Sequence, residues 1–284
     1  MRSRKHALNC RSRFTVAFLV GLLPTTAIGD EPLRWKFRKD ERIAIEVDQN
    51  SAVREASQAE SKIRQRTSLA WRVVEVDSEG IATIQQKTER VRLSISDSKE
   101  EHSADSDKAA APGALHPKIK TIWATAIAPM NATLQFRLSS FGDIIDFETS
   151  QPKETLYNPK VAIAFPKSGP KIGEPWTVQS HVKKQYWKLL LTTSYQLVGK
   201  ETVDGRELSK IKSSTAFQLE EGSEAKLVSQ NAIGLFWFDP AEGKLARSEN
   251  HQEIGLEMQR DEATTVQSIQ QSTEISYQLD SLRR

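Results

Sequence analysis

The chain has 284 residues, with 40 Lys and Arg against 37 Asp and Glu, and it contains a single cysteine. Five of these cations and none of the acids lie within the first 13 residues, and without them the formal charge changes from +3 to −2. The charge balance therefore excludes the basic footprint of a nucleic-acid-binding protein, and one cysteine excludes an internal disulfide.

Residues 1–29 have the pattern of a secretory signal peptide. A basic region precedes the ten-residue apolar run F-T-V-A-F-L-V-G-L-L, and small residues follow up to Gly29. This run is too short to span a bilayer. We expect cleavage near Gly29 and Asp30, and a mature chain, residues 30–284, that is secreted or periplasmic. That mature chain would have no cysteine, because Cys10 is removed, and no transmembrane segment.

Alternation of apolar and polar residues predicts strands through most of the mature chain. Ile43, Ile45 and Val47 share one face of the first strand, and Trp71 lies in phase with Leu69 in the second. The turn V-D-S-E-G at residues 76–80 predicts a hairpin. In its return strand the apolar positions change parity, which predicts a β-bulge near residues 85–90.

A different pattern follows. Residues 97–115 are polar and poor in β-branched residues, and we expect an exposed, mobile loop. Residues 117–128 have helical spacing between two prolines and predict one amphipathic helix. Its apolar stripe is the candidate ligand-binding surface, and the candidate residues are Ile119, Ile122, Trp123 and Ile127. Either this helix packs permanently on a sheet face, or it covers the concave side of a curved sheet and gates an apolar ligand.

The second half of the chain has a similar order of hairpins. The segment L-T-T-S-Y-Q-L-V-G-K-E-T-V-D-G-R-E-L parallels T-S-L-A-W-R-V-V-E-V-D-S-E-G-I-A, which suggests pseudo-repeats at residues 30–150 and 160–284. Residues 269–279 alternate cleanly, with Ser, Gln and Glu on the second face. This pattern predicts an antiparallel sheet with one face in water.

Side chains suited to chemistry are sparse. Glu249, His251 and Glu253 share a strand face and are plausible zinc ligands, but a metal would need further ligands from neighbouring strands. A solvated outer face is the favoured interpretation, so we expect no metal and no cofactor. The sequence contains no G-x-S-x-G, H-E-x-x-H, C-x-x-C or Gly-rich phosphate loop, and no catalytic residue can be named.

The six tryptophans are either sugar-binding platforms or core residues. Three of them lie in phase with apolar neighbours and are expected in the core, namely Trp71, Trp123 and Trp187. The pattern leaves Trp35, Trp176 and Trp237 undecided. The segment L-F-W-F is apolar on both faces, so either both faces are covered or one is a contact surface.

Several segments together resemble an uncharacterised family of secreted bacterial β-proteins, met mostly as single-domain chains behind a signal peptide. They include L-R-W-K-F, F-G-D-I-I-D, F-P-K-S-G-P-K-I-G-E-P-W-T and F-D-P-A-E-G-K-L-A-R-S. The resemblance covers nearly the whole mature chain. It implies secretion and a β fold, and it transfers no catalytic residue.

These patterns predict a mainly β protein of about a dozen strands. We expect a large antiparallel curved sheet, a half-barrel or two β-halves in one domain, with one helix at 117–128. The expected function is a non-enzymatic binding module for an apolar ligand or an envelope partner, such as a lipid or an envelope protein. The alternatives are a hydrolytic enzyme whose site is assembled from loops and a purely structural envelope module.

Overall fold

The computed structural model describes residues 32–55, 60–97, 99–108, 115–149, 162–183, 188–223, 225–260 and 263–279. The expected signal peptide, Trp187 and part of the expected mobile loop lie outside these residues. The strands are β1 (Arg42–Glu55), β2 (Ser61–Val76), β3 (Ala82–Ser96), β4 (Glu101–Asp105), β5 (Thr133–Leu138), β6 (Ile144–Thr149), β7 (Pro175–Lys183), β8 (Lys188–Val203), β9 (Arg206–Leu219), β10 (Ala225–Asp239), β11 (Lys244–Arg260) and β12 (Ala263–Leu279). The helices are α1 (Pro117–Ile127) and the short 3₁₀ helix η1 (Ala128–Asn131).

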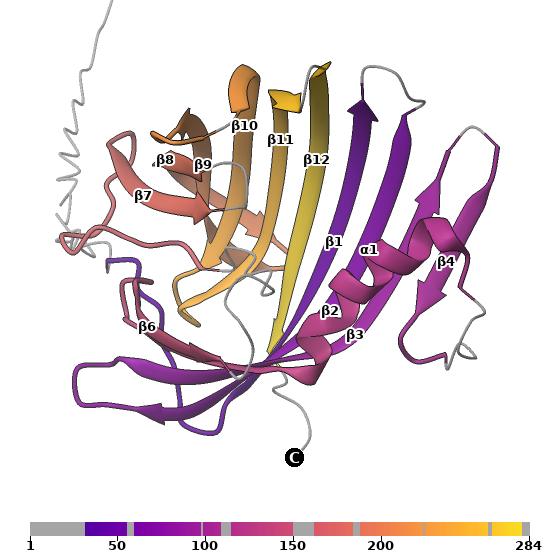
Figure 1. Ribbon diagram of the computed structural model, residues 1–284. Coiled ribbons are helices and arrows are strands. Elements are labelled where there is room, and N and C mark those ends of the chain that lie inside the picture. Colours follow the sequence, from indigo (N-terminus) through magenta and orange to yellow (C-terminus); the bar gives the residue numbers. More distant parts are fainter. Residues whose placement is uncertain are drawn as a thin grey trace, which may run out of the picture. The chain divides into compact units, whose positions relative to one another are not determined.

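The twelve strands form one antiparallel sheet. Its order is β6-β5-β3-β2-β1-β12-β11-β10-β9-β8-β7, and β4 pairs with the C-terminal end of β3. Neighbours in the sheet follow one another in the chain, except where β1 meets β12 and where β3 meets β5. The sheet is strongly curved: β7, β8 and β9 turn forward on one side, and α1 lies across β2 and β3 on the other (Figure 1). The predicted curved antiparallel β fold is therefore confirmed, while the predicted pseudo-repeats stay a prediction.

Alternation divides the sheet into two chemically different faces. Ile45 of β1 lies opposite Leu69 of β2 and Tyr277 of β12, and Trp71 lies opposite Ile43. Residues directly opposite each other in an antiparallel pair point to the same side of the sheet. We call the side that carries Trp71 the inner face and the other side the outer face.

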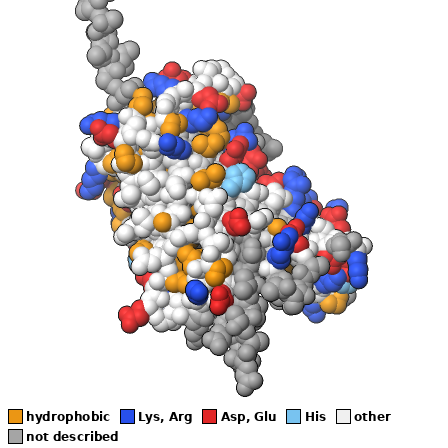
Figure 2. Space-filling view, turned by 90° about the horizontal axis from the view of Figure 1, so that it is seen from above, with side chains coloured by type: hydrophobic (Ala, Val, Ile, Leu, Met, Phe, Trp, Pro, Cys, Tyr) orange, Lys and Arg blue, Asp and Glu red, His pale blue; other side chains and the backbone are white. Residues whose placement is uncertain are grey.

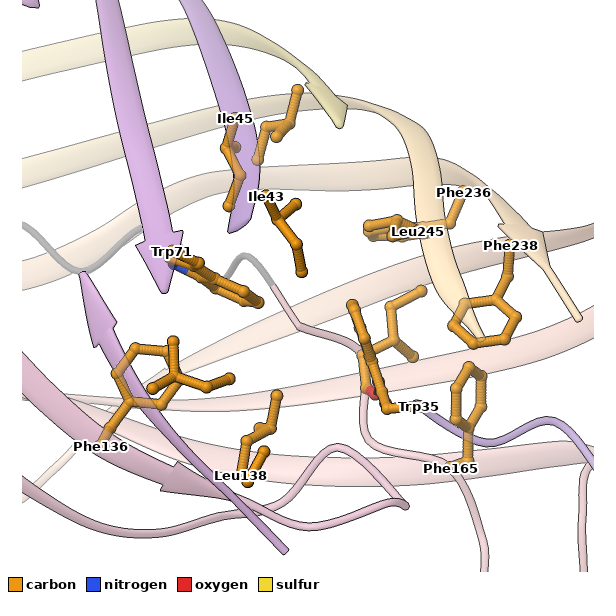
Figure 3. Packing of buried hydrophobic residues seen from close by; sticks show 14 of the residues in the cluster. Trp35, Ile43, Ile45, Trp71, Phe136, Leu138, Phe165, Phe236, Phe238 and Leu245 are labelled. Carbon is orange, nitrogen blue, oxygen red and sulfur yellow. Dashed lines mark hydrogen bonds between the residues drawn. The ribbon is translucent and has the colours of Figure 1, made fainter. Parts of the chain in front are cut away.

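The main core fills one end of the inner face. It contains 22 buried apolar residues, which come from strands in both halves of the sheet and from two segments outside the strands, at residues 33–35 and 163–165. Trp35 lies at its centre, with its ring 6.4 Å from Trp71 and 5.5 Å from Phe238 (Figure 3). Trp35 and Trp71 are 2% and 0% exposed. The core assignment of Trp71 is therefore confirmed, and Trp35, which the sequence left undecided, is a core residue.

Two irregular segments, residues 32–41 and 162–169, cross the inner face and cover this core. The indole N–H of Trp35, in the first segment, donates to the carbonyl of Ile163, in the second, at 2.9 Å and so joins the two segments. The backbone N–H of Trp35 donates to the Ser140 carbonyl at 2.8 Å and joins the first segment to the β5–β6 turn. Gly142 in that turn has φ +89°, and a Cβ there would lie 2.0 Å from the Ile163 oxygen. Only glycine allows the turn to approach the second segment so closely.

The hairpin and bulge predictions are both confirmed. β2 and β3 are joined through the turn at Asp77, whose carboxylate accepts from the amides of Glu79 and Ile81 at 2.9 Å. The β2–β3 register shifts between Ser68 and Leu69, which leaves Glu89 of β3 without an opposite residue. This bulge returns the apolar residues after it to the inner face.

The prediction of a mobile loop at 97–115 is wrong for residues 101–105. These residues form β4, which pairs with β3 from Arg92↔Asp105 to Ser96↔Glu101. Arg90 holds the end of this strand, because its guanidinium donates to both carboxylate oxygens of Asp105. The pairing and this ion pair, rather than β propensity, make the strand, which is why the composition did not reveal it.

The predicted helix is confirmed at Pro117–Ile127 and continues into η1. His116 caps it, since its Nδ1 accepts from the Lys118 amide at 3.3 Å. A second apolar group, which we call the helix cluster, anchors α1 to the sheet. It has three buried residues, Ile119, Leu93 and Ile95, and half-buried neighbours that include Ile122 and Trp123.

Candidate functional site

A pocket of about 150 Å³ lies between α1 and the inner face of β1, β2 and β3. Its floor is made by strand residues, and its roof by α1 and η1. The floor residues are Val47, Gln49, Gln65, Thr67, Leu69, Gln86 and Thr88, and the roof residues are Ile122, Thr125, Ala126 and Pro129. None of these side chains is charged. The pocket therefore offers a largely apolar roof and a floor of amide and hydroxyl groups.

The polar groups of the floor are tied to the protein. The Gln86 amide oxygen accepts from the Trp71 indole N–H at 2.8 Å, and the Gln65 amide donates to the Thr67 hydroxyl at 3.1 Å. Gln86 and Thr88 are 7% and 5% exposed. Buried polar groups with partners of this kind keep fixed positions at modest cost. Gln86 also links the pocket floor to the main core through Trp71.

Polar contacts at its N-terminus hold α1 over this pocket. The Lys118 ammonium contacts Asp97 at 3.0 Å and also pairs with Glu100. The pKa of Asp97 is lowered to about 2 by the backbone N–H of Lys99, the Lys118 ammonium and the backbone N–H of Glu100. Both carboxylates lie in or beside the β3–β4 turn, so these contacts fix one end of the helix and leave the end at Pro129 without them.

The four predicted ligand-binding residues have different positions. Ile122 lines the pocket and also packs against the helix cluster. Ile119 of α1 is fully buried against β3, and Trp123 packs in the same cluster. Neither of these residues lines the pocket, and Ile127 does not line it either. A ligand role for these residues stays a prediction, and the structure adds the floor residues, which the sequence reasoning missed. The signal that could have revealed them is the presence of Gln and Thr at strand positions in phase with Ile and Leu.

The outer face has the opposite chemistry. The Asp48 carboxylate forms ion pairs with Arg64 at 2.6 Å and with Arg66 at 2.8 Å. These ion pairs lower the pKa of Asp48, and burial raises it by a smaller amount. Seen from above, the molecule carries positive and negative side chains among hydrophobic and uncharged ones (Figure 2). Two larger grooves, of about 610 and 450 Å³, are lined mainly by outer-face residues such as Lys62, Arg64 and Arg92. We favour the smaller pocket because it is covered on two sides and excludes charge, whereas these grooves are open and lined by solvated side chains.

The structure also shows whether both faces of the L-F-W-F segment are covered. Phe236, Trp237 and Phe238 are all buried. On the outer face, Trp237 is covered by the Lys210 ammonium at 5.4 Å and the Arg247 guanidinium at 5.6 Å from its ring. Its indole N–H donates to Glu201 at 3.2 Å. Both faces are therefore covered, and this tryptophan is not an open platform.

The metal interpretation of Glu249, His251 and Glu253 finds no support in the geometry. Arg247 pairs with Glu249 and with Glu274, the latter at 3.0 Å, as expected for a solvated outer face. Among the described residues, the cluster of His and carboxylate side chains close enough to share a metal is instead Glu100, His102 and His116. No local pattern indicated this cluster, because residues 102 and 116 are brought together by the β3–β4 pairing and by the start of α1.

No helix in the described part of the chain is long and apolar enough to cross a membrane. No protein-family model and no curated protein matches the sequence.

Three solved structures match the chain weakly in a structural comparison. The first, described as lipid–protein interactions in lipovitellin, is 9% identical over 88% of this chain with a TM-score of 0.47, and the match spans about a quarter (26%) of that chain. A protein described as exported, with a YmcC-like fold, from Bacteroides fragilis is 11% identical, with 84% of this chain and 97% of that chain covered and a TM-score of 0.29. A LolA superfamily protein from Nitrosomonas europaea is 9% identical, with 87% and 90% covered and a TM-score of 0.15. All three scores lie below 0.5, so the functional argument rests on the geometry of the pocket.

Proposed function

We propose that this protein is a non-enzymatic binding protein that holds an uncharged amphiphile, such as the chain region of a lipid, beneath α1 on the inner face of the sheet. The observation that supports this proposal is the charge-free pocket on a protein in which 27% of residues are charged. Ligand sites of this kind are mostly apolar, with a few polar groups that fix orientation. Here the roof supplies apolar contact, and the glutamines and threonines of the floor supply orientation.

The size of the pocket implies that α1 moves. Its volume of about 150 Å³ is below the roughly 300–1,000 Å³ of typical small-molecule sites. A lipid chain therefore enters only if the roof shifts outward. The roof is held by three buried residues, against 22 in the main core. This difference favours the gating interpretation of the helix, with motion at the end that carries Ala126 and Pro129.

An enzymatic role is less well supported at this site. General acid–base catalysis needs a titratable group within reach of the substrate, and covalent catalysis needs an activated nucleophile. The lining residues include no Asp, Glu, His, Lys, Cys or Tyr. The three threonine hydroxyls have no neighbouring base in the lining to activate them.

The proposal includes export from the cytoplasm. The basic start of the chain, the apolar run and the small residues before Asp30 support it, as does the resemblance to a family of secreted β-proteins. A lipid carrier or sensor of the cell envelope fits both the export and the pocket. N-terminal sequencing of the protein recovered outside the cytoplasm should begin at or near Asp30; an intact Met1 would contradict export by cleavage.

The binding proposal can be tested with a pair of matched variants. Gln65→Glu places a carboxylate in the pocket floor with almost no change of shape, and Gln85→Glu makes the same change on the outer face of β3. Binding of uncharged amphiphiles, namely fatty alcohols and diacylglycerols, would be followed by tryptophan fluorescence, with Trp123→Phe used to identify the reporting ring. We expect Gln65→Glu to weaken binding at least tenfold, because a bound ligand would remove water from the new, half-buried carboxylate, and Gln85→Glu to bind like the wild type.

Two outcomes would contradict the proposal. One is that no lipid changes the fluorescence or the melting temperature of the wild-type protein. The other is that both glutamate variants bind lipid as tightly as the wild type, which would place the ligand elsewhere.

A further inference from the structure

Three side chains from separate segments meet beside the N-terminus of α1. Glu100 ends the β3–β4 turn, His102 lies in β4 opposite Ile95, and His116 is the cap of α1. The two imidazole rings are stacked, with centroids 3.8 Å apart and planes within 6°. His102 Nε2 lies 3.2 Å from a Glu100 carboxylate oxygen. One ligand atom from each residue lies within 4.8 Å of the other two.

The environment of His102 Nε2 is unusual. This nitrogen is buried and has no hydrogen bond of acceptable geometry, although the Glu100 oxygen is near. Buried polar atoms in proteins almost always have a partner, so an unpaired one points to a missing ligand or a special role. A bound metal ion would supply the missing partner, since a neutral imidazole nitrogen offers its lone pair to a metal.

We propose that Glu100, His102 and His116 form a binding site for a divalent transition metal, with zinc as the best match. Two imidazoles and one carboxylate are ligands that zinc prefers, and imidazole also suits nickel, copper and cobalt. In a tetrahedral site, neighbouring ligand atoms lie about 3.4 Å apart. The observed separations therefore require shifts of the order of 1 Å by side chains, two of which are exposed. Because the lone pair of an imidazole lies in the plane of its ring, the exposed His116 ring must also turn out of its stack on His102 so that both rings face the metal. The fourth position is open to water.

Two existing contacts would change when the metal binds. The Lys118 ammonium now pairs with both Glu100 and Asp97. When Glu100 binds the metal, Lys118 would keep its contact with Asp97, which lies 3.0 Å away. The His116 ring would lose the hydrogen bond that its Nδ1 accepts from the Lys118 amide, whichever nitrogen binds the metal. If Nδ1 binds the metal, its lone pair is no longer free to accept a hydrogen bond. If Nε2 binds the metal, Nδ1 carries the proton and cannot accept one. The metal would then replace the cap as the link that holds the first turn of the helix.

The position of the site gives the metal a structural consequence. It would join β4 directly to the N-terminus of α1, whose later turns form the roof of the inner-face pocket. Zinc should therefore slow the opening of α1 from the sheet. This inference does not depend on the proposed lipid ligand, because metal binding can be measured without any lipid.

The test uses the full chain freed of metals with a chelator. Zinc binding would be measured by calorimetry and, with cobalt as a probe, by visible absorption. Glu100→Gln and His102→Ala should each weaken binding at least tenfold, and His102→Ala combined with His116→Ala should abolish it. His251→Ala is the matched control, since His251 lies near Glu249 and Glu253 on the outer face, and it should leave the affinity unchanged.

Hydrogen exchange gives a second readout. Zinc should slow amide exchange in residues 117–127 in the wild type and in His251→Ala, but not in Glu100→Gln, whose exposed side chain can change without unfolding the protein. Unchanged affinity in Glu100→Gln and in the double histidine variant would overturn the proposal, as would the absence of zinc binding at micromolar concentration.

Discussion

The main core and the helix cluster lie on the inner face of the same sheet, yet they differ in size, composition and attachment. The main core joins strands from both halves of the chain and is covered by residues 32–41 and 162–169. The helix cluster joins α1 to β3 through Ile119, Leu93 and Ile95 and reaches β4 at the half-buried Ala104. Uncharged polar residues separate it from the core. The difference shows that one continuous sheet can carry a large apolar core at one end and a small apolar cluster at the other. From the numbers of buried residues, we expect more stability at the main-core end and a lower cost of movement at the end that carries the pocket.

The largest expected effect comes from the main core. Trp71 is fully buried, and its replacement by Ala should lower the free energy of unfolding by about 3–5 kcal/mol. Trp123→Ala should cost less than half as much, because that ring is only half-buried against the helix cluster. Urea unfolding of both variants measures the two values. Equal costs would show that the two ends are not energetically distinct. Trp71→Phe, which keeps a ring but loses the bond to Gln86, provides an intermediate case if Trp71→Ala does not fold.

An intermediate effect is expected at Ile119. This side chain is fully buried but has few buried neighbours, so Ile119→Ala should cost about 2 kcal/mol, at the low end of the range for such a change. The loss should appear as faster hydrogen exchange in residues 117–127, with little change in the strands of the main core. If exchange instead accelerates equally in β1 and β8, the helix end unfolds together with the core and the comparison fails.

The smallest effect concerns acid. The pKa of Asp105 is lowered to about 2, chiefly by the Arg90 guanidinium and also by the backbone N–H of Asp107. Its pKa in the folded protein lies below its value of roughly 3.9 in the unfolded chain, so the stabilisation is complete above about pH 4 and is lost as the pH falls towards 2. We expect β4, and with it the N-terminus of α1, to loosen in this range before the main core does. Trp123 fluorescence against pH measures this transition. Asp105→Asn should make it smaller and leave the part that belongs to Asp97, whose pKa is also lowered to about 2; an unchanged transition in Asp105→Asn would show that Asp105 does not contribute.

The strands could be predicted from the sequence because their pattern is local. Ile43, Ile45 and Trp71 alternate with polar residues, and this period alone places them on the buried face. The bulge at Glu89 was also predictable, because an extra residue in one strand is the usual cause of a change of parity. By contrast, Trp35 lies in a short alternating segment, residues 33–37, that forms no strand, and its burial depends on residues more than 100 positions away, such as Ile163.

The functional features were harder to predict for a related reason. Gln65 and Gln86 belong to a pocket only because α1 lies above them, and no local pattern encodes that placement. His102 and His116 are close because β4 pairs with β3 and a helix begins after the next turn. In both cases the site is assembled by tertiary contacts between short segments, which propensity and periodicity do not report.

The pairing of β1 with β12 has a consequence for the time course of synthesis. Thirteen residue pairs join these strands, and the partners are more than 200 positions apart in the chain. β2 can pair with one edge of β1 early, but the other edge stays without its partner until β12 has been made. Because the ribosome adds roughly 5–20 residues per second, this delay lasts about 10–40 s. During it an unpaired strand edge next to Ile45 and Val47 is open to aggregation, and such long-range pairing is slow even when the whole chain is present. The β1 edge is therefore exposed for longer than the modest size of the chain would suggest.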